Sequence, residues 1–316
     1  MKDKIVSYIK SLEPAIFGEN CKPITSVKIS KVVERDYSIN YNIIINGTKY
    51  LLKLNINKML DIDSMLGVEY NILKYMNGVF GPKVYHLDTS RKTFPYDIII
   101  CEFIDGEAPK EYNKHVLVNI AKVMSVIHSI DTDQMKTFLP TRTPFENFEL
   151  FTAFPKDIKK TKELAVINQL IAKAKHELYN NKSLFTNINQ CFIYYGIDLN
   201  NLLFKENKIK LIDWSLSCKG DKAEDIALVF AAANIFHKKP LDQKTRNLFL
   251  EQFTLYGDDR TLAKRLKLFE FLTSLYILCI LYRLLYSPTI PKEILKKHKK
   301  RYESCLRYGI GYLTHK

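Results

Sequence analysis

An amide and a carboxylate near residue 200 are spaced in a way that suits a divalent cation. Asn201 precedes a short apolar run, 202–204, and Asp213 ends the next run, 208–212. Both side chains offer the hard oxygen ligands that Mg²⁺ prefers. If the two runs are strands joined by a turn at 206–207, both side chains could reach one ion. Loops are rich in Asn and Asp for turn-forming reasons alone, so the order of the elements carries this prediction.

The elements that would position such a site begin with a β-hairpin. Residues 41–45 and 49–54 flank Asn46-Gly47, a dipeptide that readily adopts the positive φ angles of a tight hairpin turn. A helix is predicted over 64–77 from its apolar spacing, and Asn77-Gly78 is its stop signal. Two further strand-like runs follow, at 82–87 and 96–103.

The rest of the chain changes character after the turn signal Asp105-Gly106. The first hundred residues read mainly as strands and the remainder mainly as helices, which predicts an α+β fold with a small β-rich lobe, 1–106, and a larger helical lobe, 107–316. Only 191–221 breaks the helical pattern. The helical candidates are 116–130, 161–179, 223–236, 242–256, 261–286 and 291–309.

Composition excludes several classes of protein. Hydrophobic residues make up 47% of the 316 residues, which is typical of a folded globular chain. A net charge of +14 is compatible with nucleic acid, anionic lipid or a phosphorylated substrate, although scattered lysines often only solvate a surface. The seven histidines are dispersed, so a zinc site is not predicted, and neither a G-x-S-x-G nor a G-x-x-x-x-G-K-[ST] motif occurs.

The cysteines and the apolar runs bear on location. The six cysteines lie far apart, with no C-x-x-C pair, which favours reduced intracellular thiols. The first residues, 1–14, mix charges into every turn and contain no apolar core of a secretory signal. The longest apolar run, 271–282, is shorter than the roughly 20 residues of a membrane span. We therefore expect a soluble, cytoplasmic protein without a membrane span.

One segment resembles a known family. Residues 211–227, Leu-Ile-Asp-Trp-Ser-Leu-Ser-Cys-Lys-Gly-Asp-Lys-Ala-Glu-Asp-Ile-Ala, are similar to the I-D-[WF]-E…G-D-P…D-L-A pattern of the aminoglycoside phosphotransferase and choline kinase-like family. The resemblance extends from about residue 28 to 230. It implies a two-lobed protein-kinase-like fold in which 191–227 is the catalytic and metal-binding segment of the helical lobe.

The resemblance implies that ATP and Mg²⁺ are the cofactors. Asn201 and Asp213 would hold the ion, Lys53 on its strand would bridge the α- and β-phosphates, and Glu69 on the next helix would orient Lys53. Phosphoryl transfer needs mainly positioning and charge neutralisation, which these groups supply. The alternative for the lysine and the glutamate is two exposed charges on a hairpin and a helix.

The resemblance also assigns the nucleotide contacts. No Gly occurs between residues 19 and 46, so Ser38 and Asn40 would take the place of a glycine-rich phosphate loop, although a simple polar turn fits them equally well. Backbone groups near Glu102 and Ile104, in the hinge-like run 98–106, would face adenine, with Ile212 below the ring. A buried strand explains those apolar residues just as well.

The chain departs from the family at the general base. Relatives carry H-x-D-x-x-x-x-N, whereas counting back from Asn201 places Gly196 at the Asp position and Tyr194 at the His position. In one hypothesis the loop is shortened and Asp198 is the base. In the other the alignment has no gap, the base is lost, and the chain is a nucleotide-binding pseudokinase, a scaffold or a slow transferase.

The acceptor would be a small molecule with a hydroxyl group, of the amino alcohol or aminoglycoside type. Tyr276, Tyr282 and Tyr286 could form an aromatic cage for a cation, or simply a core stripe. The basic run 296–301, Lys-Lys-His-Lys-Lys-Arg, could attract an anionic acceptor or RNA, or form a solvated helix face. Our prediction is an ATP-dependent phosphotransferase; a pseudokinase and a basic RNA-binding protein are the alternatives.

Overall fold

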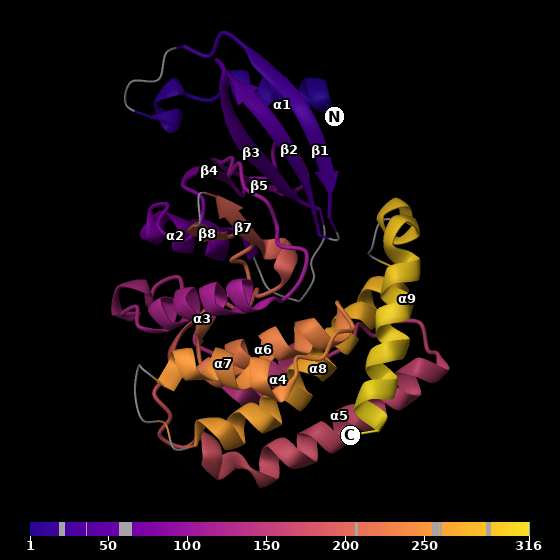
Figure 1. The fold of residues 1–316 in the computed structure, drawn as a ribbon. Helices are drawn as coiled ribbons and strands as arrows, with labels where there is room; N and C mark the ends of the chain where they lie inside the picture. Colours follow the sequence, from indigo (N-terminus) through magenta and orange to yellow (C-terminus); the bar gives the residue numbers. More distant parts are fainter. Residues whose placement is uncertain are drawn as a thin grey trace.

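The computed structural model describes the chain except residues 19–22, 36, 57–64, 206–207, 255–258, 260, 289–291 and 316. Its first part is built on a five-stranded antiparallel sheet with the strand order β1-β2-β3-β5-β4 (Figure 1). The strands are β1 (Val27–Glu34), β2 (Ser38–Ile45), β3 (Thr48–Asn55), β4 (Val84–Asp88) and β5 (Asp97–Glu102).

The predicted hairpin is confirmed as β2 and β3. Ile45 pairs with Thr48, and the two residues between them, Asn46 and Gly47, have φ angles of 47° and 88°. Positive φ at both turn positions matches the right-handed twist of the strands, and Asn and Gly adopt it at low cost. The turn therefore fixes the register that places Lys53 in the middle of the sheet, opposite Asn40 and Ile99.

Two helices accompany the sheet. The helix predicted at 64–77 is α2 (Met65–Met76), and it ends where Asn77 and Gly78 both take positive φ. The first residue of that prediction, Ser64, lies outside the described residues. A second helix, α1 (Lys2–Lys10), was not predicted; it buries Ile5, Tyr8 and Ile9.

The second part is mainly helical (Figure 1). At its centre α6 and α8 pack against each other with apolar residues on nearly all sides, so their sequences show little amphipathic contrast. The sequence-based helices are all present within a few residues, and residues 255–256 and 291 of those predictions lie outside the described residues. Helix α4 was not predicted; it spans only nine residues. The helices are α3 (Lys114–His128), α4 (Pro144–Thr152), α5 (Lys162–Asn180), α6 (Lys222–Ile235), α7 (Gln243–Thr254), α8 (Leu262–Tyr286) and α9 (Lys292–Thr314).

The most apolar helix, α8, is long and apolar enough to cross a membrane by length and composition alone. In its most apolar window, however, 78% of the residues are buried inside the protein. Arg265 and Arg283 are also buried in α8, the first bonded to Asp221 and the second to the carbonyl of Phe151. These features are those of the core helix of a globular fold.

Two short strand pairs interrupt the helices between residues 191 and 220. Strand β6 (Cys191–Ile193) pairs with β9 (Cys218–Gly220), and β7 (Leu202–Lys205) pairs with β8 (Lys208–Leu211). The β7–β8 hairpin lies between α2 and α3, below the five-stranded sheet, and its predicted turn at 206–207 lies outside the described residues (Figure 1). The fold is therefore the predicted α+β architecture, a β-rich part followed by a larger helical part. β5 ends at Glu102 and α3 begins at Lys114, and the predicted division at residue 106 lies between them.

Candidate active site

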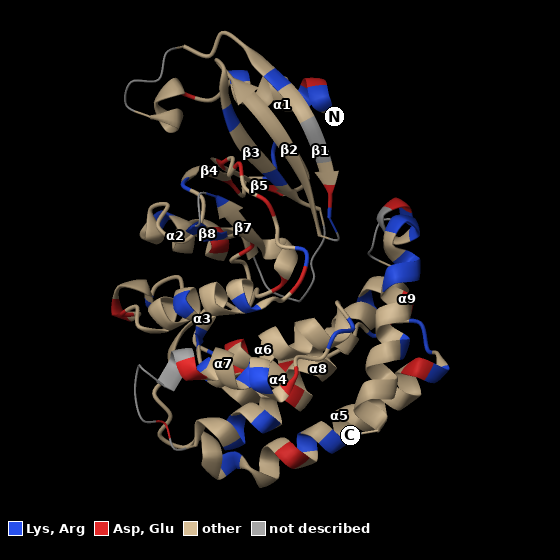
Figure 2. Cartoon of the chain, viewed as in Figure 1, with Lys and Arg blue, Asp and Glu red and all other residues tan. Residues whose placement is uncertain are grey.

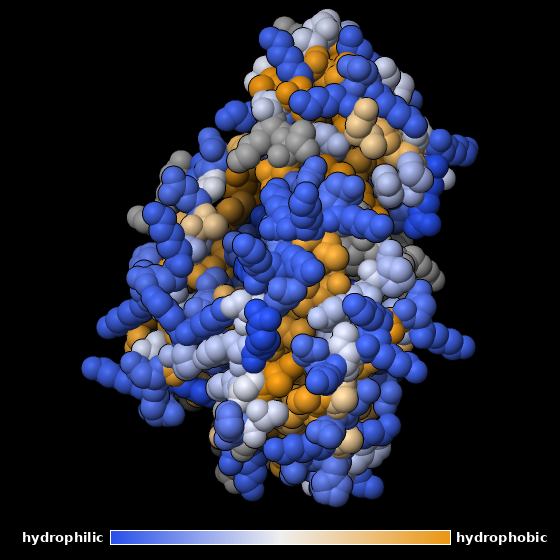
Figure 3. Space-filling view, turned by 90° about the vertical axis from the view of Figure 1, so that its right-hand side faces the viewer, coloured by the Kyte–Doolittle hydropathy of each residue, from blue (hydrophilic) through white to orange (hydrophobic). Residues whose placement is uncertain are grey.

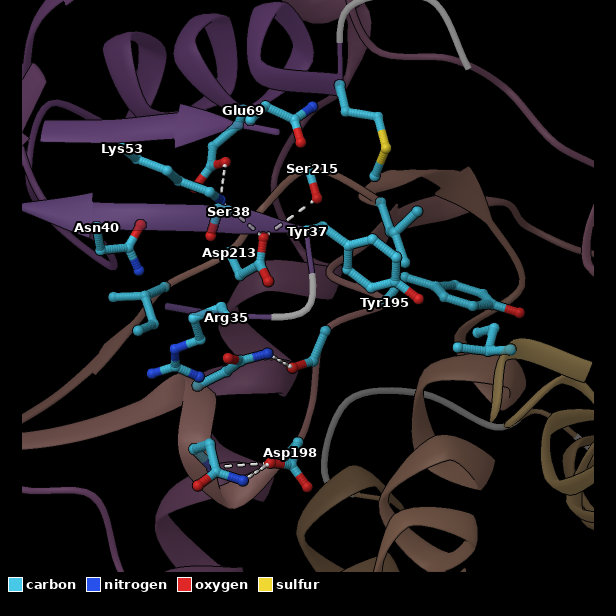
Figure 4. Close-up of a pocket in the computed structure, with 18 of the residues that line it drawn as sticks. Arg35, Tyr37, Ser38, Asn40, Lys53, Glu69, Tyr195, Asp198, Asp213 and Ser215 are labelled. Carbon is cyan, nitrogen blue, oxygen red and sulfur yellow. Dashed lines mark hydrogen bonds and ion pairs between the residues drawn. The ribbon is translucent and has the colours of Figure 1, made fainter. Parts of the chain in front are cut away.

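Three charged side chains from three elements converge below the sheet. Lys53 on β3 places its Nζ 2.7 Å from Glu69 Oε2 on α2 and 3.0 Å from Asp213 Oδ1, which follows β8 (Figure 4). The lysine and glutamate side chains are largely buried, whereas that of Asp213 is 49% exposed. Residues 160 positions apart in the sequence thus meet in one ion-pair network, and the carboxylate on the open side can face a ligand.

The network fixes the charges of Lys53 and Asp213. Burial alone would lower the pKa of Lys53, but the carboxylates of Asp213 and Glu69 outweigh it and raise that pKa well above its ordinary value. Burial tends to raise the pKa of Asp213, and the ammonium of Lys53 holds it below the usual range. Burial raises the pKa of Glu69. The lysine is therefore a permanent cation at neutral pH and Asp213 a permanent anion.

The two predicted metal ligands stand next to each other at the end of the β7–β8 hairpin. Leu202 pairs with Leu211, and the amide of Ile212 donates to the carbonyl of Asn201 at 3.0 Å. Asp213 has a φ of 68°, a left-handed conformation that turns its side chain out of the strand direction. Ser215 donates to its Oδ1 at 3.2 Å. Non-glycine residues in this conformation cluster at functional sites.

The residues at this hairpin fit a divalent cation. Asn201 donates its Nδ2 to the carbonyl of Gly196 at 3.0 Å, and no described residue donates to its Oδ1. Lys53 and Ser215 both bond to Oδ1 of Asp213, which leaves Oδ2 for a ligand. One amide oxygen and one carboxylate oxygen form an incomplete set of hard ligands of the kind that Mg²⁺ completes with phosphate oxygens and water.

A buried carboxylate holds the segment that leads to Asn201. Asp225 on α6 accepts the backbone amides of Tyr194 at 2.8 Å and Tyr195 at 2.7 Å, and His128 Nε2 lies 3.1 Å from it. Tyr195 has a positive φ of 58°, so the two amides turn toward one acceptor. The D-I-A part of the sequence pattern therefore acts here as a support for the loop at 194–201.

The space beside Gly196, which is the position of the usual base if the alignment has no gap, is filled by the side chain of Tyr194. A Cβ added to Gly196 would lie 2.8 Å from Cζ of Tyr194 and 3.0 Å from the carbonyl oxygen of Asp213. The Tyr194 ring is fully buried, its centroid is 4.6 Å from that of Trp214, and its hydroxyl donates to the carbonyl of Ile212. The buried ring of Tyr194 therefore requires a residue without a side chain at position 196.

The candidate base Asp198 lies in the same cavity but apart from Lys53 and Asp213 (Figure 4). It accepts the backbone amide of Asn200 at 2.9 Å, and His237 Nε2 lies 3.2 Å from its other oxygen. Burial tends to raise the pKa of Asp198, but the hydrogen bonds from His237 and Asn200 outweigh it and lower that pKa. The group is an anion at neutral pH.

One cavity of about 550 Å³ between the sheet and the helices is lined by Lys53, Glu69, Asp198, Asn201 and Asp213. Ser38, Asn40 and Ile212 line it as well. Glu102 and Ile104 are not among the described residues that line it, and the Glu102 amide donates to the carbonyl of Lys83 at 2.8 Å. The cavity thus brings together most of the residues singled out in the sequence, while the two hinge residues lie outside it.

The structure adds residues that the sequence did not single out. Arg35, in the connection between β1 and β2, is exposed, lines the cavity beside Ser38 and Asn40, and its charge helps to lower the pKa of Asp213 (Figure 4). In the sequence, this role is indicated by the position of Arg35 three residues before Ser38. The second addition is Tyr195, whose ring stacks on Phe151 with a centroid distance of 5.2 Å.

Fold and site together define a kinase-like phosphotransferase architecture. The family model described as phosphotransferase enzyme family matches residues 66–260, more than half of the chain, so this protein belongs to that family. No curated protein matches the sequence significantly.

Solved structures of kinases share the fold. An ethanolamine kinase of Plasmodium vivax has 16% identity and a TM-score of 0.67, covering 100% of this chain and 88% of that one. A choline kinase of Cryptosporidium parvum has 16% identity and a TM-score of 0.57, covering 100% and 97%. An amicoumacin kinase in complex with AMP-PNP, Ca²⁺ and Ami has 12% identity and a TM-score of 0.60, covering 97% and 96%. At these identities the likeness establishes the protein-kinase-like fold.

Proposed function

We propose that the protein is an ATP-dependent phosphotransferase that moves the γ-phosphoryl group to a hydroxyl of a small molecule. The observation that carries the proposal is the convergence of Lys53, Glu69 and Asp213 beside Asn201 in one cavity. A soluble, cytoplasmic location remains part of this proposal. The amicoumacin kinase, which shares the fold, holds a nucleotide analogue and a divalent ion.

Each group has a physical task in the proposed reaction. Lys53 pairs with the α- and β-phosphates, and Glu69 keeps it in place without a large entropic loss. Asn201 and Asp213 hold Mg²⁺, which when bound neutralises charge on the phosphates. Ser38 and Asn40 donate hydrogen bonds at the phosphate end. At the other end of the nucleotide, the side chain of Ile212 contacts adenine. Glu102 and Ile104 lie just beyond the described lining, after the cavity residue Cys101, and their backbone groups would reach the outer edge of the ring.

We propose Asp198 as the base that accepts the proton of the acceptor hydroxyl. Among the described carboxylates of the cavity, only Asp198 and Glu34 are not paired with Lys53, and Glu34 is exposed on β1. A base with a lowered pKa assists less than one poised near the operating pH, so its contribution falls at the lower end of the usual range of about 10²- to 10⁴-fold.

Titration calorimetry with AMP-PNP tests the nucleotide site. We expect binding that strengthens when Mg²⁺ is added, and an Asp213→Asn variant that has lost the Mg²⁺ effect. Asp157→Asn is the matched control, because Asp157 is exposed and is not among the cavity residues. Nucleotide binding that is absent, or independent of Mg²⁺ in the unmodified protein, would contradict the proposal.

A second candidate function is a nucleotide-binding pseudokinase or scaffold. It is favoured by Gly196, which leaves no carboxylate at the position of the usual base. Release of ³²P-labelled product from ATP over a panel of alcohols separates the two candidates. A protein that binds Mg²⁺ and nucleotide but yields no labelled product with any acceptor supports the pseudokinase.

A further inference from the structure

The helical side of the cavity has a composition that bears on the acceptor. Helices α4, α6, α8 and α9 supply apolar, aromatic and basic residues together with Thr273, and none of the described residues they contribute is Asp or Glu. A cationic acceptor is normally paired with carboxylates or enclosed by open aromatic faces. The described residues that these helices contribute to the cavity therefore include no carboxylate that could pair with a cationic acceptor.

The aromatic residues do not form an open cage either. The ring of Phe151 stacks with those of Tyr195 and Tyr276, at centroid distances of 5.2 and 5.0 Å and interplanar angles of 4° and 21°. One face of each tyrosine ring is therefore turned toward Phe151, and all three rings are almost fully buried. The edges of aromatic rings are electropositive and repel a cation. The stack is suited to contact an apolar body.

Two buried hydroxyls in this wall lack partners. Among the described residues, the hydroxyls of Tyr195 and Tyr276 have no hydrogen-bond partner although both residues are almost fully buried. Burial raises the pKa of both tyrosines well above its ordinary value, so both stay protonated and can donate. A buried polar group without a partner is costly, so a polar atom of a ligand would relieve that cost.

Two cations stand at the rim on α9. Lys297 and Arg301 are one turn apart, line the cavity, are exposed and have no ion-pair partner among the described residues. Figure 2 shows that Lys and Arg crowd the first half of α9, the part nearest the sheet. Viewed from the α9 side, the surface has apolar side chains lying between rows of hydrophilic ones (Figure 3). The inner part of a ligand bound there would contact apolar side chains, and its outer end would lie near the two positive charges.

We infer that the acceptor is an anionic amphiphile: an alcohol with an apolar body that packs against the Phe151 ring stack and an anionic group that pairs with Lys297 and Arg301. This inference rests on the proposed function. It changes the expected class of acceptor from the amino alcohols and aminoglycosides expected from the sequence to an anionic alcohol. The anion can be a carboxylate or a phosphate, since both accept from Lys and Arg.

Three probes of equal chain length test the inference: ω-hydroxyoctanoate, octanediol and ω-aminooctanol. Their binding to the ADP-loaded protein is measured by titration calorimetry, and their phosphorylation by transfer of ³²P from ATP. We expect the carboxylate to bind at least about tenfold more tightly than the ammonium compound, with the diol between them. Octyl phosphate, added as a competitor, shows whether a phosphate is accepted in place of the carboxylate.

Charge reversal on α9 provides the matched variants. Lys297→Glu with Arg301→Glu should reverse the order of the carboxylate and ammonium probes. Lys296→Glu with Lys300→Glu makes the same charge change, one turn apart on the same helix, at residues that do not line the cavity, and should preserve the order. If the first double variant does not fold, Lys297→Met with Arg301→Gln should abolish the preference.

The outcomes separate this inference from the proposed function. Absence of nucleotide binding overturns the proposed function. Intact nucleotide binding with no preference for the carboxylate, with a preference for the ammonium compound, or with no binding of any probe overturns the inference alone. An equal loss of preference in both pairs of charge-reversal variants also overturns it, because the effect would then be one of net charge.

Discussion

The ring of Tyr194 occupies the space that a side chain at residue 196 would need. A Cβ on Gly196 would come within 2.8 Å of Tyr194 Cζ, and the ring is held by Trp214 and by its hydrogen bond to Ile212. The ring at residue 194 and the absence of a side chain at residue 196 therefore depend on each other, and in an alignment without a gap these two positions are those of the usual His and Asp.

This coupling predicts a non-additive pair of substitutions. Gly196→Asp alone should destabilise the protein without increasing turnover, because the carboxylate clashes with a fixed ring. Tyr194→His combined with Gly196→Asp, made in an Asp198→Asn background that lacks the proposed base, should raise phosphoryl transfer by about 10²-fold, the usual contribution of a general base. Turnover of the single and double variants under saturating ATP checks this. A single variant as active as the double one would contradict it.

Asp198 has its own test. Because Asp198 is the proposed base, the Asp198→Asn variant should have a turnover lower by about 10²-fold and an unchanged nucleotide affinity. The matched control is Asp157→Asn, which is exposed and outside the cavity. Steady-state kinetics together with AMP-PNP calorimetry provide the two readouts. Turnover equal to that of the unmodified protein would leave Asp198 as a cap of the turn at Asn200 and favour the hypothesis of a lost base.

The pair of Lys53 and Glu69 predicts separable effects on stability and binding. Lys53→Met should cost about 3 kcal/mol of unfolding free energy, since it leaves a buried carboxylate without its cation. Lys53→Met with Glu69→Gln should recover most of that stability. Both variants should bind the nucleotide more weakly than the unmodified protein, because the phosphates lose their cation in both. Urea unfolding and AMP-PNP calorimetry measure the two quantities; recovered affinity in the double variant would refute the role of Lys53.

A buried glutamate predicts a pH dependence of stability. Burial raises the pKa of Glu224 well above its ordinary value, and its Oε2 accepts from Asn147 at 2.5 Å. The folded protein therefore holds a proton that the unfolded chain has released, so this group's contribution to stability falls as the pH rises above about 4.5. Glu224→Gln should remove that fall. Unfolding free energies of both proteins from pH 4 to 8 check it, and parallel curves would contradict it.

The sequence by itself determined the local elements and the residue types of the site. Asn46-Gly47 specified a hairpin because few other dipeptides tolerate two positive φ angles, and the order of Lys53, Glu69, Asn201 and Asp213 predicted a kinase-like cleft. Strand β1 was missed because its apolar residues do not alternate cleanly, and α1 because its contacts lie on the distant strands β1 and β4.

Only the tertiary structure decided which of several equivalent residues face the site. The run 296–301 is uniformly basic, yet the helical period and the packing of α9 turn Lys297 and Arg301 toward the cavity and leave Lys296 and Lys300 outside it. The meaning of Gly196 likewise depended on a contact with Tyr194 that no spacing reveals. Such choices depend on how distant elements pack, and local periodicity carries no information about that packing.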